Sequence, residues 1–499
     1  MNATTTTTTT TVAAVDLGAS SGRVVVGRYC GGDVELQEMH RFANVPVRAG
    51  AHLRWDVLRL FRGIVEGLDQ AGRRFGPLNG VGVDSWAVDY GLLDADGELL
   101  ANPISYRDGG TGAAVTAVLA ELGADGLYQA TGIQLQPFNT LFQLLSRRET
   151  ASAGSARRLL LIPDLISYWL SGEAGTELTN ASTTQLLDPR TLHWSADLSS
   201  RLGVPIGLFP ALRSPGQILA PVTPLLGLPG RPDVITVPSH DTAAAVAGIP
   251  ADTEDFAYVC TGTWALVGVE LPAPVITEAS RAANFTNEVG VGGSIRFLRN
   301  VTGFWLLQEC IRIWRGQGLE VDAASLTEAA VSVPGLRVLI DVQDPEFAAP
   351  VDMPATIRVQ ARTAGGARTA DGAGLDSPAE VTRCILDSMC LAIRRAVREA
   401  ADLSGRSVRV VHVVGGGVAN ELFCQLVADA CQLPVVAGPT EAACWGNVMS
   451  QLGALGVVGD SPAEHRALIR RAEQPRGYSP RGTEHSWEEA DLLMQRISR

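Results

Sequence analysis

The stretch VAAVDLGASSGRVVVGRY, residues 12–29, determines the fold expected of this chain. Two apolar runs flank residues 16–23, which are rich in Gly and Ser, so the stretch predicts a strand, a tight turn and a second strand. The segment DFAYVCTGTWALVGVEL, residues 255–271, repeats this pattern in the second half of the chain. Two hairpins with turns of Gly, Ser and Thr indicate a duplicated fold.

Helical and strand patterns continue outward from the first hairpin. Residues 57–70 place their apolar side chains on one face and predict a helix, and residues 113–122 predict another. The segment GVGVDSWAVDYGLL, residues 80–93, predicts a second strand pair, followed by a turn at Asp96 and Gly97. Hairpins mixed with helices indicate an α/β layer architecture, distinct from strictly alternating β and α elements.

The second half of the chain begins after a segment rich in Pro and Gly, residues 201–231, which we expect to run over the surface. Residues 408–414 predict a β-branched strand, which ends in the glycine triplet 415–417 and is followed by a helix-like segment.

These patterns divide the chain into four parts. We expect a disordered Thr-rich tail over 1–11, an N-terminal domain over 12–248, a C-terminal domain over 249–455 and a polar helical appendage over 456–499.

The 499 residues include 40 arginines and no lysine. The chain therefore lacks the P-loop lysine, the strand lysine of protein kinases and the amine of Schiff-base chemistry. Any phosphate must be held by backbone N–H groups, a metal ion or arginine. The net charge of −13 argues against a nucleic-acid partner, which requires a basic surface.

Other classes are also disfavoured by composition. The sequence contains no apolar run long enough to span a membrane and no signal-peptide pattern. Its eight cysteines form no C-x-x-C pair, so a zinc site or disulfide framework is not expected. We expect buried free thiols in a reducing cytoplasm.

The turn DLGASSGR, residues 16–23, has the small residues that let successive N–H groups face an anion. Asp16, at the end of its strand, is placed to hold magnesium through water. For this loop taken alone, a plain hairpin turn is the favoured interpretation. The second turn, TGTW at 261–264, favours a polyphosphate site, and the triplet 415–417 allows close approach of a nucleotide.

The cluster SHDT, residues 239–242, lies where an apolar strand passes into a helix. A carboxylate at this position can cap the helix or accept a hydroxyl proton. The abrupt change from apolar to polar residues favours a site that binds a polyol.

Several further motifs together resemble the FGGY carbohydrate kinases, from about residue 12 to 455 and in unbroken order. They are DLGASSGR, GVDSWAVDY, YRD at 106–108, LQPFNTLFQL at 135–144, IPDLISYWLSGE at 162–173, TNASTTQLLD at 179–188, SHDTA, TGTW, NVTGFWLLQE at 300–309, VGGG and GPTEA at 438–442. The resemblance implies a two-domain actin-like (ribonuclease H-like) ATPase fold with an interdomain cleft, in which the N-terminal domain binds the sugar and carries a phosphate loop and the C-terminal domain binds the nucleotide.

Within the family, the motifs are most similar to those of members that phosphorylate L-rhamnulose at its 1-hydroxyl. The resemblance implies that Asp241 is the general base. It implies sugar contacts from Ala87, His240, Thr242 and Asn300, ATP contacts from Ala19, Ser20, Ser21, Gly22, Arg23, Thr263, Gln308 and Gly416, and Mg²⁺ organised by Asp16. Ala87 stands where the family has glycine, so its backbone N–H can contact a sugar only if its φ is negative.

The expected partners are a small-molecule ketose and ATP with Mg²⁺, with no nucleic acid and no membrane, for a cytoplasmic monomer or weak homo-oligomer. Two alternatives stay open at this point. One is another ketose kinase of the same family, acting on L-fuculose or L-xylulose. The other is a non-catalytic actin-like module that binds sugar and ATP, from which the carboxylate of Asp241 distinguishes an enzyme.

Overall fold

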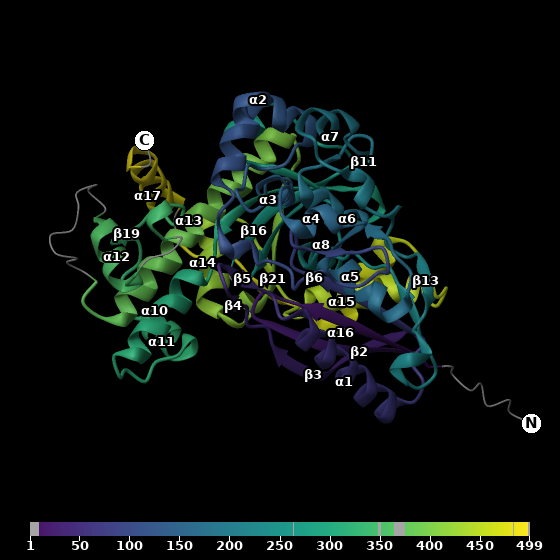
Figure 1. Cartoon of the computed structure of the whole chain (residues 1–499). Helices are drawn as coiled ribbons and strands as arrows, with labels where there is room; N and C mark the ends of the chain where they lie inside the picture. Colours follow the sequence, from purple (N-terminus) through teal and green to yellow (C-terminus); the bar gives the residue numbers. More distant parts are fainter. Residues whose placement is uncertain (1–8, 263, 348–350, 364–374, 483, 498–499) are drawn as a thin grey trace, which may run out of the picture. The chain divides into compact units, whose positions relative to one another are not determined.

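The computed structural model describes residues 9–262, 264–347, 351–363, 375–482 and 484–497 (Figure 1). Two compact units make up the chain. Unit 1 comprises Met1–Asp252, Glu270–Phe297 and Ala442–Gln474, and unit 2 comprises Thr253–Val269, Leu298–Glu441 and Pro475–Arg499. The predicted domain boundary near residue 248 lies close to Asp252, where the first segment of unit 1 ends. A single boundary does not describe the division, however, because two later segments of the chain also belong to unit 1.

Unit 1 is built on a six-stranded sheet in the order β13-β14-β6-β1-β2-β3. The predicted first hairpin is confirmed, since β1 pairs antiparallel with β2, whereas β1 and β6 are parallel. The strands are β1 (Thr10–Leu17), β2 (Ser21–Cys30), β3 (Asp33–Ala43), β6 (Gly80–Ser85), β13 (Ile218–Pro221) and β14 (Asp233–Ile235).

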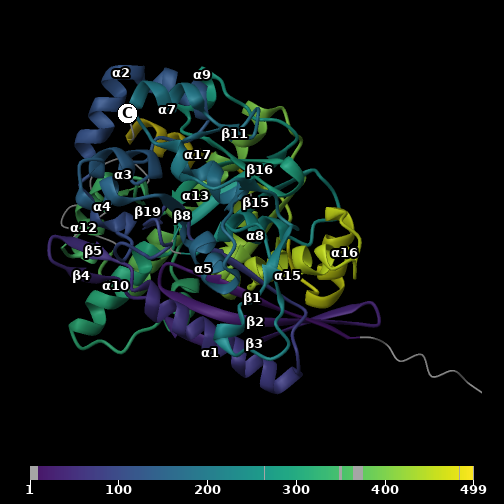
Figure 2. The same cartoon turned by 45° about the vertical axis from the view of Figure 1, so that its right-hand side comes forward.

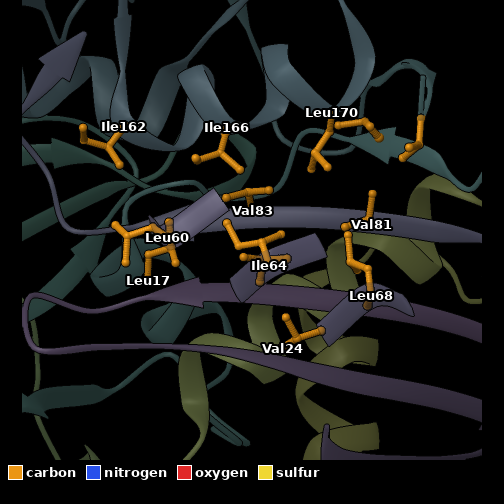
Figure 3. Close-up of a cluster of buried hydrophobic side chains, with 14 of the residues drawn as sticks. Leu17, Val24, Leu60, Ile64, Leu68, Val81, Val83, Ile162, Ile166 and Leu170 are labelled. Carbon is orange, nitrogen blue, oxygen red and sulfur yellow. The ribbon is translucent and has the colours of Figure 1, made fainter. Parts of the chain in front are cut away.

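Side chains of β1 alternate between two cores, as the period of a strand requires. Ala13, Val15 and Leu17 pack with helices α1 (Val57–Phe75) and α5 (Ile162–Ser171), and Figure 3 shows the apolar side chains of both helices meeting the sheet. The opposite face packs on α15 (Ala442–Ala454) and α16 (Pro462–Glu473), which lie across the sheet from α1 in Figure 2. The predicted helix 57–70 is therefore confirmed as part of α1.

Many of the remaining elements of unit 1 contribute to a second apolar cluster or to short strand pairs. The predicted helix 113–122 lies within α2. These elements are α2 (Gly112–Thr131), α3 (Thr140–Arg147), α4 (Ala151–Ser155), α6 (Leu178–Ala181), α7 (Ala196–Leu202), α8 (Asp241–Ala247), α9 (Glu278–Ala282), β4 (Val47–Ala49), β5 (His52–Arg54), β7 (Tyr90–Leu93), β8 (Arg158–Leu161), β9 (Thr176–Glu177), β10 (Leu187–Asp188), β11 (His193–Trp194), β12 (Leu212–Arg213) and β17 (Thr286–Val289).

The predicted strand pair over residues 80–93 is wrong. Both segments are strands, but β6 pairs with β1 and β14, whereas β7 pairs with β8. Val88, at φ 67°, redirects the chain between them, so β7 leaves the main sheet. The Pro- and Gly-rich segment 201–231 is also less irregular than expected, because it contributes β13 to the sheet edge.

Unit 2 repeats the core pairing of unit 1, which confirms the expected duplication. Strand β15 (Phe256–Thr261) pairs antiparallel with β16 (Trp264–Leu271) and parallel with β21 (Val410–Gly415). The sheet continues through β22 and β23. The other elements are α10 (Trp305–Gly316), α11 (Ala323–Val331), α12 (Met353–Gln360), α13 (Pro378–Ser404), α14 (Glu421–Cys431), α17 (Glu484–Ile497), β18 (Ile295–Thr302), β19 (Val338–Leu339), β20 (Arg362–Thr363), β22 (Val435–Ala437) and β23 (Arg476–Tyr478).

The two chain ends depart from the sequence prediction. Residues 1–8 of the predicted tail lie outside the described residues, and Thr10 and Thr11 belong to β1. The predicted appendage 456–499 is not a separate part. Its first helix, α16, contributes Leu468 and Ile469 to the core of unit 1, whereas β23 adds an antiparallel strand to β22 in unit 2.

All eight cysteines are free thiols, as predicted, and seven are buried, but Cys30 is exposed. Within the described ranges, no helix combines the length and the apolar character that a membrane span requires.

Helices α8 and α15 of unit 1 approach so closely that only glycine fits between them. A Cβ atom on Gly446 would lie 1.9 Å from the carbonyl oxygen of Ala244, and one on Gly248 would lie 2.1 Å from that of Ala442. Because α8 begins at Asp241, this contact fixes the position of the predicted general base.

We expect Gly446→Ala to destabilise the protein by about 1–3 kcal/mol or more, since the methyl group would have to displace backbone atoms. Urea unfolding measures the change. Gly126→Ala in α2 is the matched control, because an added Cβ there comes no closer than 3.9 Å to another atom. The control should be neutral or stabilising by up to about 1 kcal/mol. Equal effects of the two substitutions would contradict the close contact.

Candidate active site

Three carboxylates lie at one edge of the unit 1 sheet. Asp16 on β1 is the register partner of Asp84 on the parallel strand β6. The next residue of β6, Ser85, forms a parallel bridge with His240, and Asp241 follows as the first residue of α8. The carboxyl ends of parallel strands are where α/β sheets usually bind ligands.

Asp16 holds the guanidinium group of Arg23 through a single oxygen. Its Oδ2 accepts from Arg23 Nε at 2.9 Å and Nη2 at 2.5 Å, and Cys444 Sγ lies 3.7 Å from the same atom. Among the described residues, no donor contacts Asp16 Oδ1. The arginine expected beside phosphate is therefore paired with the aspartate expected to organise magnesium.

Asp84 is fully buried and only half satisfied. Its Oδ2 accepts from Asn447 Nδ2 at 2.6 Å, whereas no donor within the described ranges reaches Oδ1. Gln451 Nε2 supports this contact by donating to Asn447 Oδ1 and to the carbonyl oxygen of Ala13. Burial raises the pKa of Asp84 well above its usual value, and the charges of Asp16 and Asp241 raise it further.

The oxygen atoms left open on Asp16 and Asp84 are hard ligands. Carboxylate oxygens without a hydrogen-bond donor are the atoms that a magnesium ion takes, and a cation there would offset the repulsion between the carboxylates. The described residues therefore fit such an ion.

The first turn is rigidly closed. Gly18 N–H donates to the Ser21 carbonyl at 2.9 Å, and Asn44 donates through Nδ2 to Gly18 O at 2.8 Å and through its backbone N–H to Ser20 O. Ser20 is exposed, while Ala19 and Ser21 are half-buried.

Gly22 and Arg23 have structural partners instead of open space. A Cβ on Gly22 would lie 2.3 Å from the ring of Phe42, so packing already accounts for this glycine. The guanidinium group of Arg23 donates hydrogen bonds to the carboxylate of Asp16.

The SHDT segment connects to a buried ion pair. His240 Nδ1 lies 3.3 Å from Glu288 Oε2 and 3.1 Å from Arg296 Nη2, and the two latter groups are 3.0 Å apart. Burial alone would raise the pKa of Glu288, but Arg296 and His240 bring it below its ordinary value. This pair orients the imidazole, whose Nε2 faces Asp241.

Asp241 accepts from Thr242 Oγ1 at 3.1 Å and lies 3.5 Å from His240 Nε2. Its side chain is 32% exposed, so a substrate can reach it. Burial raises the pKa of Asp241; the His240 ring lowers it, but the charge of Asp16 raises it again and the net shift is upward. A raised pKa makes this carboxylate a stronger base once it is ionised.

A second buried carboxylate, Glu177, fixes the chain just before this group. Its Oε2 accepts from the backbone N–H of Ser239 at 3.0 Å and from Ser239 Oγ at 2.8 Å, and its Oε1 accepts from Thr179 N–H at 2.8 Å. Glu177 therefore links α6 to the segment that presents His240 and Asp241.

Ala87 lies half-buried beside a strained residue. The φ angle of Ala87 is not positive, so the condition for a sugar contact through its backbone N–H is met. Val88, in contrast, has φ 67°. The backbone N–H of Asp89 donates to the carbonyl oxygen of Ala87 at 2.9 Å, which closes a tight turn around Val88. Such a conformation of a β-branched residue costs of order 1–3 kcal/mol and is held by its surroundings. Thr140 Oγ1 donates to Val88 O at 2.7 Å.

Asp89 anchors the aromatic residues around Ala87. Its Oδ2 accepts from the indole nitrogens of Trp55 at 2.6 Å and Trp86 at 3.1 Å, and from Tyr106 N–H at 3.1 Å. Burial raises the pKa of Asp89 to about 6 despite these donors. The Trp55 and Trp86 rings are 4.4 Å apart between centroids.

The other predicted site residues belong to unit 2. Gly416 is exposed and has open space, and the neighbouring Gly417 N–H donates to Thr261 Oγ1 at 2.9 Å. Gln308 is exposed on α10, and the carbonyl oxygen of Asn300 on β18 accepts from a glutamine side chain. Thr263 lies outside the described residues.

Asp16, residues 19–23 and residues 240–242, which the sequence interpretation assigned to the N-terminal domain, all lie in unit 1. The sequence interpretation missed the partners of these groups. The sequence did contain a signal for Asp84. In GVGVDS, as in VAAVDL, an aspartate stands next to last in an apolar strand. Glu177, Glu288 and Arg296 carried none, since their partners are far away in the sequence.

The fold agrees with a family match that covers most of the chain. Residues 11–248 match the N-terminal domain, and residues 257–455 the C-terminal domain, of the FGGY family of carbohydrate kinases. The chain belongs to this family and is a carbohydrate kinase.

Two relatives bear a more specific name. The chain is 39% identical over 473 residues to a rhamnulokinase of Bacteroides thetaiotaomicron, covering 94% of this chain and 95% of that protein. It is 41% identical over 462 residues to a rhamnulokinase of Enterococcus faecalis, covering 91% of each chain.

Solved structures confirm the predicted two-domain α/β kinase fold. A ligand-bound xylulose kinase from Lactobacillus acidophilus matches with a TM-score of 0.80 at 18% identity, over 98% of this chain and 97% of that one. A Plasmodium falciparum glycerol kinase with ADP matches with a TM-score of 0.79 at 13% identity, with the same coverage.

We expect Asp84→Asn to stabilise the protein in the absence of ligands, because the amide keeps an acceptor for Asn447 and removes a buried charge. A carboxyl whose pKa is raised by folding binds its proton more tightly when folded, so its contribution to stability declines as pH rises above the unfolded pKa. The gain from Asp84→Asn should therefore be larger at pH 8 than at pH 5.5 in urea unfolding.

Asp96→Asn, on an exposed turn, is the control and should change little at either pH. A stabilisation by Asp84→Asn that is equal at both pH values, or larger at pH 5.5, would contradict the raised pKa of Asp84.

Proposed function

We propose that this kinase transfers the γ-phosphoryl group of ATP to the 1-hydroxyl of L-rhamnulose, as a cytoplasmic monomer or weak homo-oligomer. The observation that carries the proposal is the identity of 39% over 94% of the chain with a rhamnulokinase. The carboxylate edge of unit 1 supports it, since an accessible aspartate with a raised pKa stands beside polar groups suited to a sugar.

Asp241 is the proposed general base. Its carboxylate takes the proton of the 1-hydroxyl as the sugar oxygen bonds to the γ-phosphorus, and the bond from that phosphorus to the bridging oxygen of ADP breaks. The transition state of such transfers is loose, so positioning and charge neutralisation supply most of the acceleration. Ala87, His240, Thr242 and Asn300 are the proposed sugar contacts.

The nucleotide is proposed to lie against residues 19–23 and against Thr263, Gln308 and Gly416. Mg²⁺ would be held near Asp16 Oδ1 and Asp84 Oδ1, where it neutralises charge on the phosphates when it is bound. Arg23 already pairs with Asp16, so its first role is to hold this aspartate in place, and a phosphate would contact N–H groups of the guanidinium outside this pair.

An ADP-release assay across ketoses tests the acceptor. We expect L-rhamnulose to give the highest kcat/KM, above L-fuculose and L-xylulose. A higher value for either of these two sugars would assign the chain to another ketose kinase. Absence of ADP release with every sugar, despite binding of sugar and ATP, would instead favour a non-catalytic module.

We expect Asp241→Asn to lower kcat by about 10²–10⁴-fold, the usual contribution of a general base, while ATP affinity stays nearly unchanged. Steady-state kinetics and calorimetric titration of the nucleotide measure the two effects. Asp96→Asn serves as the surface control and should keep full activity. A variant Asp241→Asn that retained most activity would rule out this residue as the base.

A further inference from the structure

Unit 1 contains a pocket of about 340 Å³ that the proposed reaction does not use. It lies between β7, the segment 100–104, the C-terminal part of α3 and residues 203–208. None of the residues proposed to bind the sugar, the nucleotide or the metal lines it. Its volume falls in the range of small-molecule sites.

Most of the wall is apolar. Leu92, Leu100, Pro103, Leu144 and Leu208 contribute to it, and the buried ring of Tyr90 lies among them. Such a wall favours a ligand with an apolar body, because burying its surface is favourable at roughly 25 cal/mol per Å².

The charged side chains of the lining all have the same sign. Arg54, Arg147 and Arg148 line the pocket together with His52, and no acidic residue does so. Arg148 is exposed and lies 3.9 Å from Glu149, so it contributes mainly at the rim.

Arg54 is the cation with least compensation. It is half-buried and its Nη1 donates to the carbonyl oxygen of Asn102 at 2.6 Å, but within the described residues no carboxylate lies within 4 Å of it. Arg147 is 4.0 Å from Asp108, which also contacts His52 at 2.8 Å. Arg54 and Arg147 therefore have one neighbouring carboxylate between them, which leaves positive charge facing the pocket.

We propose that this pocket binds a small organic anion with an apolar body, whose carboxylate or phosphate monoester group pairs with Arg54 and Arg147. Arginine presents a fork of N–H donors that matches both kinds of anionic group. The apolar wall then selects against inorganic anions, and the arginines select against neutral molecules of the same shape.

Isothermal titration calorimetry tests the proposal with benzoate and phenyl phosphate as probes, and with benzyl alcohol and inorganic phosphate as comparisons. We expect at least one aromatic anion to bind tenfold or more tightly than both comparisons, in the presence of saturating L-rhamnulose. If benzyl alcohol or inorganic phosphate binds as tightly as both aromatic anions, or if the sugar displaces them, the proposal is wrong.

Two variants on α4 locate the binding. Ala153 lines the pocket, and Ala153→Trp should fill it and weaken anion binding at least tenfold, whereas Ala151→Trp, at an exposed position of the same helix, should not. Equal affinities of the two variants would overturn the assignment.

A charge variant tests the anion contact separately. Arg54→Met should weaken binding of the aromatic anion about tenfold and leave benzyl alcohol unaffected, while Arg59→Met, exposed on α1, changes neither. An unchanged affinity for the anion in Arg54→Met would contradict the role of this arginine. If Arg54→Met does not fold, the α4 pair still decides the location.

Discussion

The parallel pairing of β1 with β6 is the constraint on which the candidate site depends. In parallel strands the carboxyl ends meet at one edge, and the register sets Asp16 beside Asp84. The bridge from Ser85 to His240 carries the same edge to the start of α8, where Asp241 follows. A shift of one residue in this register would place Asp16 and Asp84 on opposite faces of the sheet.

Three carboxylates at one edge repel each other, and the fold compensates each of them differently. Arg23 neutralises Asp16, the amide of Asn447 donates to Asp84, and His240 and Thr242 contact Asp241. Asp84 nevertheless keeps an unsatisfied buried oxygen. A buried group left in this state is unfavourable for folding, so its presence indicates that the site is arranged for a ligand and not for stability.

Local patterns predicted the elements whose burial follows their own sequence. The hairpin of β1 and β2, helix α1 and strand β21 all show their period directly, and the repeated hairpin predicted the duplication. The pairing of β6 was not accessible in this way. Its sequence resembles a hairpin arm, but whether it pairs with β7 or β1 depends on the turn at Val88 and on packing against α5 and α15.

The same limit applied to the site. The turn and the SHDT segment are continuous in sequence, so their residues could be grouped in advance. The groups that orient them could not, because Glu177 is 62 residues from Ser239 and Arg296 is 56 residues from His240. A local sequence pattern does not report contacts between residues far apart in the chain. For the same reason, the close approach of α8 and α15 at Gly446 could not be predicted from the sequence.

At the first turn, the positive side chain is an arginine, as it must be in a chain without lysine. A lysine ammonium is a flexible point charge, whereas the guanidinium group of Arg23 is a planar fork that gives two donors to Asp16 Oδ2 and leaves Oδ1 open. The arginine therefore fixes the direction of the carboxylate as well as balancing its charge. Besides this guanidinium group, the turn offers an anion the backbone N–H groups of Ala19 and Ser20 and the hydroxyl groups of Ser20 and Ser21. Gly18 N–H is already used to close the turn, so apart from Arg23 the capacity of this loop for phosphate rests on residues 19–21.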